Sequence, residues 1–274
     1  MKKHLKYLLH YVSILLLIFC SFTVISCGGD DDDNNNPSSN VDPNNTNANI
    51  PDASNGYDKA VLRTEFPRLK SSSKVIVYRT STTTSDKDRV PFAAEWDSNK
   101  RTQRWTCYQM HKGYSGSYSR ESNFYFDTDN LSSTEYWGEF KYFPGYDRGH
   151  ICPSGDRTAS KELNSQTFVM TNMQPQYGSF NQKGTWFKME DALRKKASSI
   201  KNDKDTLFVV KGGTIDSPEN IIEYINGRQT VYTATTGYIP VPKYFFVAIL
   251  EKAFDTESNK HKYSAFGYWF PHEN

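Results

Sequence analysis

Residues 185–198 are the strongest helix candidate in a chain whose other apolar runs are mostly short. In this segment Trp186, Met189, Leu193 and Ala197 recur every three or four residues and would share one helix face. The strand-like runs are 74–79, 92–96, 104–110, 147–151, 167–171, 206–211, 229–233, 244–250 and 262–270. Few helices among many strands predict an α+β domain with a central, mainly antiparallel sheet flanked by helices and long loops.

The N-terminus has the pattern of an export signal. Three lysines among the first six residues precede an apolar run over 8–19, which suits a signal peptide and is short for a bilayer span. VISC at 24–27 resembles the lipobox of bacterial lipoproteins. It predicts that residues 1–26 are removed and that Cys27 is lipidated. The lipid would anchor an exported protein in a bacterial outer membrane, and the cell surface is the candidate location. The alternative is a plain secreted protein in which Cys27 is incidental.

Residues 27–56 consist largely of Asp, Asn, Pro and Ser, and they bury too little apolar surface to fold. We expect a disordered linker, followed by one catalytic domain over 57–274. The linker holds six of the 31 acidic residues and no Lys or Arg, and residues 1–26 hold three of the 33 basic residues. The domain is therefore mildly basic, which suits a polyanionic partner such as nucleic acid without requiring one.

Two cysteines belong to the predicted domain. Cys107 and Cys152 are compatible with a disulfide in an exported protein and equally with two buried free thiols. Their spacing matches no zinc ligand set.

The stretch 146–194 contains the side chains that cleavage of a phosphodiester needs. The reaction requires a base that deprotonates water, and cationic charge for the phosphate and the departing oxygen. His150 supplies an imidazole that is neutral near pH 7. Mg²⁺ prefers oxygen ligands and is often held by few protein atoms, so the amide oxygen of Asn181 suits it.

Four motifs in this stretch resemble one family. They are DRGH at 147–150, TNMQPQ at 171–176, NQ at 181–182 and WFKME at 186–190. DRGH alone would be weak, but the four together, in this order, resemble the DNA/RNA non-specific endonucleases of the ββα-metal group, which includes endonuclease G. The resemblance implies a ββα-metal fold and Mg²⁺-dependent hydrolysis of DNA and RNA with little sequence preference, leaving 5′ phosphates. Mn²⁺ is the expected substitute metal.

The resemblance also implies roles for particular residues. His150 would be the general base, and Asn181 the direct protein ligand of the metal. Glu190 would hold a metal-bound water, and Asn172 corresponds to an active-site asparagine. Each residue has a plainer interpretation, because a single histidine is usually structural and Asn181 could be a helix cap.

Three arginines complete the implied site. Arg148 would contact substrate phosphate, and Arg194, one helical turn after Glu190, would bind substrate. Arg120, in SYSR, resembles the family's upstream arginine that stabilises the transition state. Glu190 and Arg194 could instead form an ordinary surface pair contributing only ~0.3 to 0.5 kcal/mol. Asp147 is expected to fix the backbone of its motif.

The chain departs from the family pattern at two places. Nine residues separate Asn181 from Glu190, where the family usually has eight, and we expect the turn at Gly184 to absorb the extra residue. The sequence stops after residues 268–274, where family members usually continue through another helix and strand, so a C-terminally truncated domain is one interpretation.

Three functions remain open. The first is the nuclease, which would act on DNA and RNA and contact the membrane through its lipid. No protein partner is predicted for it. The second is a catalytically silenced surface lipoprotein that captures nucleic acid. The third is a sequence-specific ββα-metal homing or restriction enzyme, which would lack the pattern that links Asn181 to Glu190.

Overall fold

The structure is a computed structural model, which divides into units Met1–Asn40 and Val41–Asn274. It describes residues 49, 58–70, 73–80, 90–135, 143–200, 204–226, 230–231 and 238–274. The predicted signal peptide, Cys27 and most of the predicted linker lie outside these residues. Asn49 is the part of that linker that is described, and it is buried against the domain. Its amide Nδ2 donates to the carbonyls of Val61 (3.1 Å) and Pro67 (2.8 Å).

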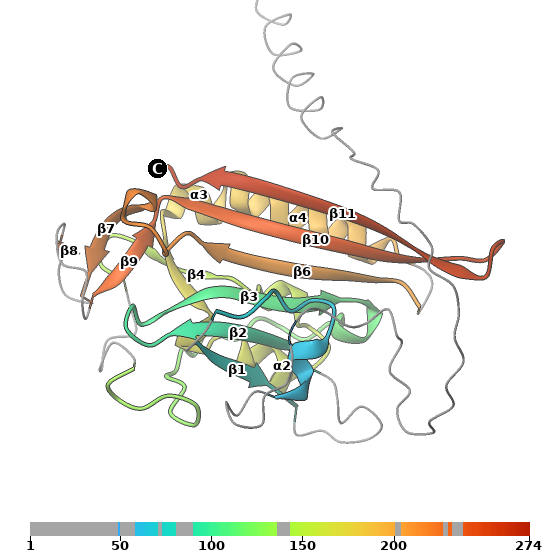
Figure 1. Cartoon of the computed structure of the whole chain (residues 1–274), viewed down its shortest axis with the longest axis horizontal. Helices are drawn as coiled ribbons and strands as arrows, with labels where there is room; N and C mark the ends of the chain where they lie inside the picture. Colours follow the sequence, from blue (N-terminus) through green and yellow to red (C-terminus); the bar gives the residue numbers. More distant parts are fainter. Residues whose placement is uncertain are drawn as a thin grey trace, which may run out of the picture. The chain divides into compact units, whose positions relative to one another are not determined.

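A six-stranded sheet forms the centre of the second unit, in the order β1-β2-β3-β6-β10-β11 (Figure 1). Its strands are β1 (Lys74–Tyr78), β2 (Phe92–Asp97), β3 (Thr102–Met110), β6 (Thr206–Gly213), β10 (Tyr244–Asp255) and β11 (Lys260–Pro271). Every neighbouring pair is antiparallel, which confirms the predicted architecture. The strands predicted at 92–96 and 104–110 pair as the hairpin β2–β3, and Asp97 closes its turn by accepting hydrogen bonds from the backbone N–H groups of Asn99 and Lys100.

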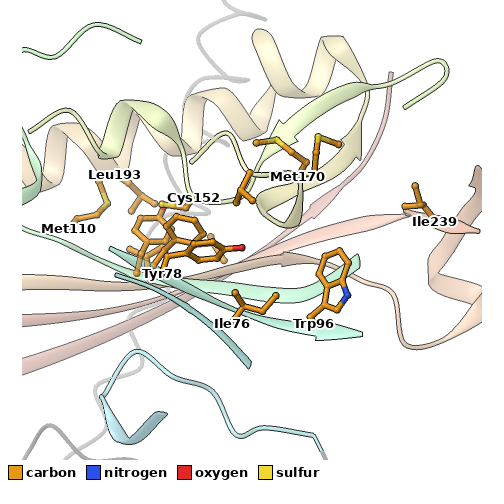
Figure 2. Close-up of a cluster of buried hydrophobic side chains, with 14 of the residues drawn as sticks. Ile76, Tyr78, Trp96, Met110, Cys152, Met170, Leu193 and Ile239 are labelled. Atoms are coloured by element: carbon orange, nitrogen blue, oxygen red, sulfur yellow. The ribbon is translucent and has the colours of Figure 1, made fainter. Parts of the chain in front are cut away.

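Alternation along the strands gives the sheet two apolar faces. In β3, Trp105 and Cys107 pack with Val61 of the short helix η1 (Lys59–Leu62), whereas Tyr108 and Met110 point to the other face. That second face is covered by helix α4 (Thr185–Ser198) and by the loops around the predicted site. Figure 2 shows side chains from the sheet and from this cover meeting in one cluster.

The two cysteines belong to different faces of the sheet. Cys107 packs in the cluster with Val61, and Cys152 packs in the cluster with Leu193 of α4. Both are buried free thiols, so the structure favours free thiols over a disulfide.

Helix α4 has the predicted bounds and buries Trp186 and Leu193 against the sheet. The short helix α3 (Gly178–Gln182) ends just before it. Gly184 lies in the turn between them, and a Cβ there would come within 2.6 Å of the Ser179 carbonyl. Only glycine permits this close approach, which agrees with the expectation that this turn holds the extra residue.

Two local predictions were wrong. Residues 167–171 form no strand: Met170–Asn172 is a 3-10 turn (η4), and strand β5 (Met173–Gln176) begins after it. The sequence predicted no helix between residues 153 and 166, yet this segment contains a 3-10 turn, η3 (Ser154–Asp156), and helix α2 (Lys161–Gln166), which is capped by Ser160.

The remaining elements lie around this core. They are η2 (Lys112–Tyr114), β4 (Asp147–His150), η5 (Pro218–Asn220), β7 (Ile221–Ile225), β8 (Thr230–Val231) and β9 (Ile239–Pro242). Strands β8, β7 and β9 form a separate small sheet, of which the sequence predicted only the β8 region. Within the described residues, no helix has the length and apolar character needed to cross a bilayer.

Candidate active site

Strands β4 and β5 pair antiparallel and carry the first two motifs side by side. Gly149 lies opposite Gln174, and a Cβ on Gly149 would overlap the side chain of Gln176. Gln174 fastens the pair to the central sheet. Its Nε2 donates to the Gln103 carbonyl at 2.9 Å, and its Oε1 accepts the Gly213 N–H at 2.7 Å. Strand β4 therefore has a fixed position over β3 and β6, and His150 lies at its end.

A pocket of about 530 Å³ opens beside the end of β4. It contains six of the seven residues predicted for catalysis, substrate binding or metal binding, which are Arg120, Arg148, His150, Asn181, Glu190 and Arg194. They come from a loop, β4, α3 and α4. His150 and Asn181, distant in the sequence, thus share one cavity.

His150 is 8% exposed, and its ring packs edge-on against Phe168 with the ring centres 4.8 Å apart. The ring hydrogen bonds with the backbone of Arg148, while the buried Nε2 has no partner among the described residues. Since Nε2 is free, Nδ1 makes the backbone bond. Burial, reinforced by the positive charges of Arg120 and Lys211, lowers the pKa of His150 to about 3. The imidazole is therefore neutral, and Nε2 presents a lone pair.

The orientation of Asn181 is set by Asp147. The Asn181 Nδ2 donates to Asp147 Oδ2 at 3.0 Å, and Gln182 Nε2 donates to the same oxygen at 2.8 Å. Because a carboxylate only accepts, the amide cannot be flipped without losing this bond, and Oδ1 is the atom left for the pocket. Asp147 thus acts through its side chain, which the sequence interpretation missed. Asn181 does not cap α4, since Gly184 holds the cap position.

Glu190 on α4 pairs with Lys211 on β6, with Lys211 Nζ 2.7 Å from Glu190 Oε1. Burial raises the pKa of Glu190, and the Lys211 charge opposes this rise. The Lys211 side chain is fully buried. The sequence did contain a signal for it, because Leu207, Val209 and Lys211 alternate on the covered face of β6, and a charge in that position requires a partner.

Arg120 and Arg148 line the pocket and stack on the aromatic rings of neighbouring residues. The Arg148 guanidinium carbon is 3.5 Å from the ring centre of Phe124, and that of Arg120 is 5.0 Å from Phe168. Arg120 also donates to Ser154 Oγ. Stacking holds both guanidinium groups in place, and a planar guanidinium can bind two oxygens of a phosphate at once.

Arg194 is held by a different carboxylate from the one its spacing suggested. Its Nη1 lies 3.2 Å from Asp156 Oδ1, and Asp156 also accepts from the hydroxyl of Tyr108 at 3.2 Å. The alternative of a plain pair between Glu190 and Arg194 is therefore wrong, because each is paired elsewhere. Asp156 is 6% exposed and belongs to η3, so Arg194 is fixed at the pocket wall.

Asn172 is the predicted site residue that lies outside the pocket. It is completely buried, and its Nδ2 donates to the carbonyls of Cys152 and Thr167, both at 2.8 Å. Its Oδ1 accepts the Cys152 N–H, also at 2.8 Å. The predicted catalytic role of Asn172 stays a prediction, and the contacts seen here are structural. Asn172 clamps the segment that follows His150.

The donors around the pocket fit a hard divalent cation held by few protein atoms. The described residues contain no cluster of three His, Cys, Asp or Glu side chains that could form a cage for a metal. Asn181 would supply an amide oxygen, and Glu190 a carboxylate that binds through water, which suits Mg²⁺ because this ion keeps several waters. His150 lines the same pocket, and its buried Nε2 has no hydrogen-bond partner in the part of the chain that the structure describes.

This arrangement defines a ββα-type site with one histidine, one amide and a ring of arginines. Residues 71–274 match the family model described as DNA/RNA non-specific endonuclease, so the chain belongs to that family.

Three curated nucleases are similar to part of the chain. A nuclease of Nostoc sp. is 34% identical over 152 residues, which are 53% of this chain and 50% of that protein. Nuclease C1 of Cunninghamella echinulata is 33% identical, covering 44% of each chain. The mitochondrial nuclease of Saccharomyces cerevisiae is 29% identical over 48% of this chain and 39% of its own. The matched segment thus spans half or less of each relative.

Among solved structures, a chain of the EndoG/EndoGI complex aligns with a TM-score of 0.47 and 19% identity. The alignment covers 70% of this chain and 74% of that chain.

Proposed function

We propose that this protein is a Mg²⁺-dependent endonuclease that hydrolyses phosphodiester bonds of DNA and RNA with little sequence preference. The observation that carries the proposal is the convergence of His150 and Asn181 on one pocket, with the Nε2 of His150 unpartnered. Membership of the endonuclease family supports the same reaction.

In this proposal His150 is the general base. Its Nδ1 bond to the Arg148 backbone leaves Nε2 as the lone pair that takes a proton from the attacking water. The depressed pKa keeps the ring unprotonated before substrate binds. A bound phosphate then places negative charge beside the ring. This charge stabilises the imidazolium that forms when His150 takes the proton.

The arginines bind the phosphate, and the amide and carboxylate hold the metal. Arg120, Arg148 and Arg194 are fixed at the pocket wall and offer N–H groups to phosphate oxygens. Asn181 would bind Mg²⁺ directly and Glu190 through a water, with Mn²⁺ as a substitute. When bound, the ion supplies positive charge to the phosphate and to the 3′ oxygen that departs, so the products carry 5′ phosphates.

Low sequence preference follows from the kinds of group in the pocket. Guanidinium groups and a hydrated cation recognise phosphate, which carries no base information. Binding should also weaken steeply with salt as counterions are released from the nucleic acid.

The lipid anchor is a separate part of the proposal. We propose export and attachment to the bacterial outer membrane through Cys27, supported by the signal-like residues 1–26 and the lipobox-like VISC at 24–27. Metabolic labelling with a clickable fatty acid should mark the protein, and Cys27→Ser should abolish the label. Equal labelling of both proteins would contradict the anchor.

One incubation tests the enzymatic proposal. Supercoiled plasmid and RNA are mixed with the purified protein in Mg²⁺ and, separately, in EDTA. The nuclease should degrade both substrates to a smear in Mg²⁺ only. Retention of DNA without any product would indicate the silenced capture protein, and discrete fragments would indicate a sequence-specific enzyme.

A further inference from the structure

Lys211 carries a buried positive charge outside the pocket surface. Its side chain is fully buried, and its ammonium lies 4.9 Å from the ring centre of Trp186 and 5.5 Å from that of Tyr108. Its ion-pair partner is Glu190, through Oε1 at 2.7 Å. A buried ammonium is costly to retain without a strong partner, so the position of Lys211 depends on this carboxylate.

Packing alone does not account for a lysine at this place. The same face of β6 carries Leu207 and Val209, and an apolar side chain of similar length would fill the space below α4. Replacement of a buried ion pair by apolar groups is often neutral or stabilising. The ammonium therefore has a use other than fold stability.

The geometry indicates what that use is. Glu190 lines the pocket, whereas Lys211 lies behind it and is not part of the lining. The ion pair engages Oε1 from the sheet side, and this fixes the rotation of the carboxylate about its axis. Without the ammonium, Glu190 would be free to turn towards the guanidinium groups of Arg194 and Arg120, which share the cavity.

We propose that Lys211 is a positioning residue that fixes the Glu190 carboxylate so that its second oxygen faces the pocket, in the orientation that holds a metal-bound water. This inference rests on the proposed nuclease function. Lys211 touches neither substrate nor metal in this account, and its positioning effect acts through Glu190.

A double-mutant cycle with Lys211→Met, Glu190→Gln and the combined variant tests the proposal. Lys188→Met is the control, because Lys188 is an exposed lysine on α4, the helix that carries Glu190. We expect Lys211→Met to lower kcat at least tenfold with KM changed less than about threefold, and Lys188→Met to be unchanged. In the Glu190→Gln background, Lys211→Met should lower kcat no further. Additive losses, or a full kcat in Lys211→Met, would overturn the proposal.

A second readout needs neither metal nor activity. In EDTA, urea unfolding should show that Lys211→Met lowers the midpoint of the wild-type protein and does not lower it in the Glu190→Gln background. An equal loss in both backgrounds would make Lys211 a packing residue and contradict the proposal. DNA affinity in EDTA should be unchanged, and a loss there would indicate direct phosphate contact instead.

These outcomes are separable from failure of the proposed function. A wild-type protein that cuts nothing in Mg²⁺ refutes the nuclease assignment, while the unfolding cycle still reports whether Lys211 acts through Glu190. If Lys211→Met does not fold, Lys211→Gln replaces it with the same expected coupling.

Discussion

His272 provides a pH-dependent link between the sheet and the helix that carries Asn181. Its Nε2 accepts the backbone N–H of Tyr177 at 2.7 Å, and its Nδ1 donates to the Pro242 carbonyl at 2.7 Å. Tyr177 immediately precedes α3. Protonation of Nε2 removes the acceptor and places a charge in a site that is 3% exposed. We therefore predict that acid loosens this link.

The size of the effect follows from the pKa. Burial lowers the pKa of His272 from 6.5 to about 4. Because the folded pKa is depressed, the unfolded chain takes up protons first, and stability is lost as pH falls below 6.5. The loss from this group is about 2 kcal/mol at pH 5 and about 3 kcal/mol at pH 4, since one pKa unit corresponds to about 1.4 kcal/mol.

His272→Gln is the matched variant. Glutamine offers an amide oxygen for the Tyr177 N–H and an N–H for the Pro242 carbonyl, but it does not titrate. Urea unfolding of both proteins at pH 7.5, 6, 5 and 4 in EDTA gives the difference in stability at each pH. Shared groups, including His150, cancel in this difference. We expect the free energy of unfolding of the variant, measured relative to that of the wild type, to increase by about 2 to 3 kcal/mol between pH 7.5 and pH 4. Parallel pH profiles would refute the reasoning.

Three further predictions concern the support of the site. Gly149→Ala should destabilise the protein by about 1 to 3 kcal/mol in urea melts, because its Cβ overlaps the Gln176 side chain, and Gln176→Ala should restore part of the loss. Asn172→Ala should lower stability by about 1 to 3 kcal/mol for each buried group left unpaired, as calorimetry would show; an unchanged melting temperature would contradict the clamp. Asp147→Ala should raise the Mg²⁺ concentration needed for half-maximal cleavage without weakening DNA binding in EDTA, since the Asn181 amide loses its orientation. Unchanged metal dependence would contradict that assignment.

The sequence predicted the elements whose periodicity is strong. The bounds of α4 were predicted correctly, and β2 and β3 lie where two of the strand-like runs were predicted, because apolar spacing determines them locally. The apolar run at 168–170 was mistaken for a strand. It is a buried loop. A short apolar run has the same sequence pattern in a buried strand and in a buried loop, so periodicity cannot tell them apart.

In the site, too, the sequence predicted residues that belong to local motifs and missed their partners from distant segments. Motif spacing located His150 and Asn181 because each belongs to a short motif, DRGH or NQ, that can be read from the sequence alone. Their controlling partners come from distant segments, and no local pattern joins Lys211 to Glu190 or His272 to Tyr177. Asn172 belongs to a motif but serves the fold, which only its burial reveals.

The central claim is that the Nε2 of His150 deprotonates the attacking water. The most direct measurement is the initial rate of plasmid nicking in Mg²⁺ by His150→Ala, compared with wild type and with His261→Ala, a histidine on β11 that does not line the pocket. Loss of the general base should lower the rate by about 10²- to 10⁴-fold, while the control should remain within twofold of wild type. A His150→Ala protein that nicks plasmid within a few-fold of the wild-type rate would contradict the account.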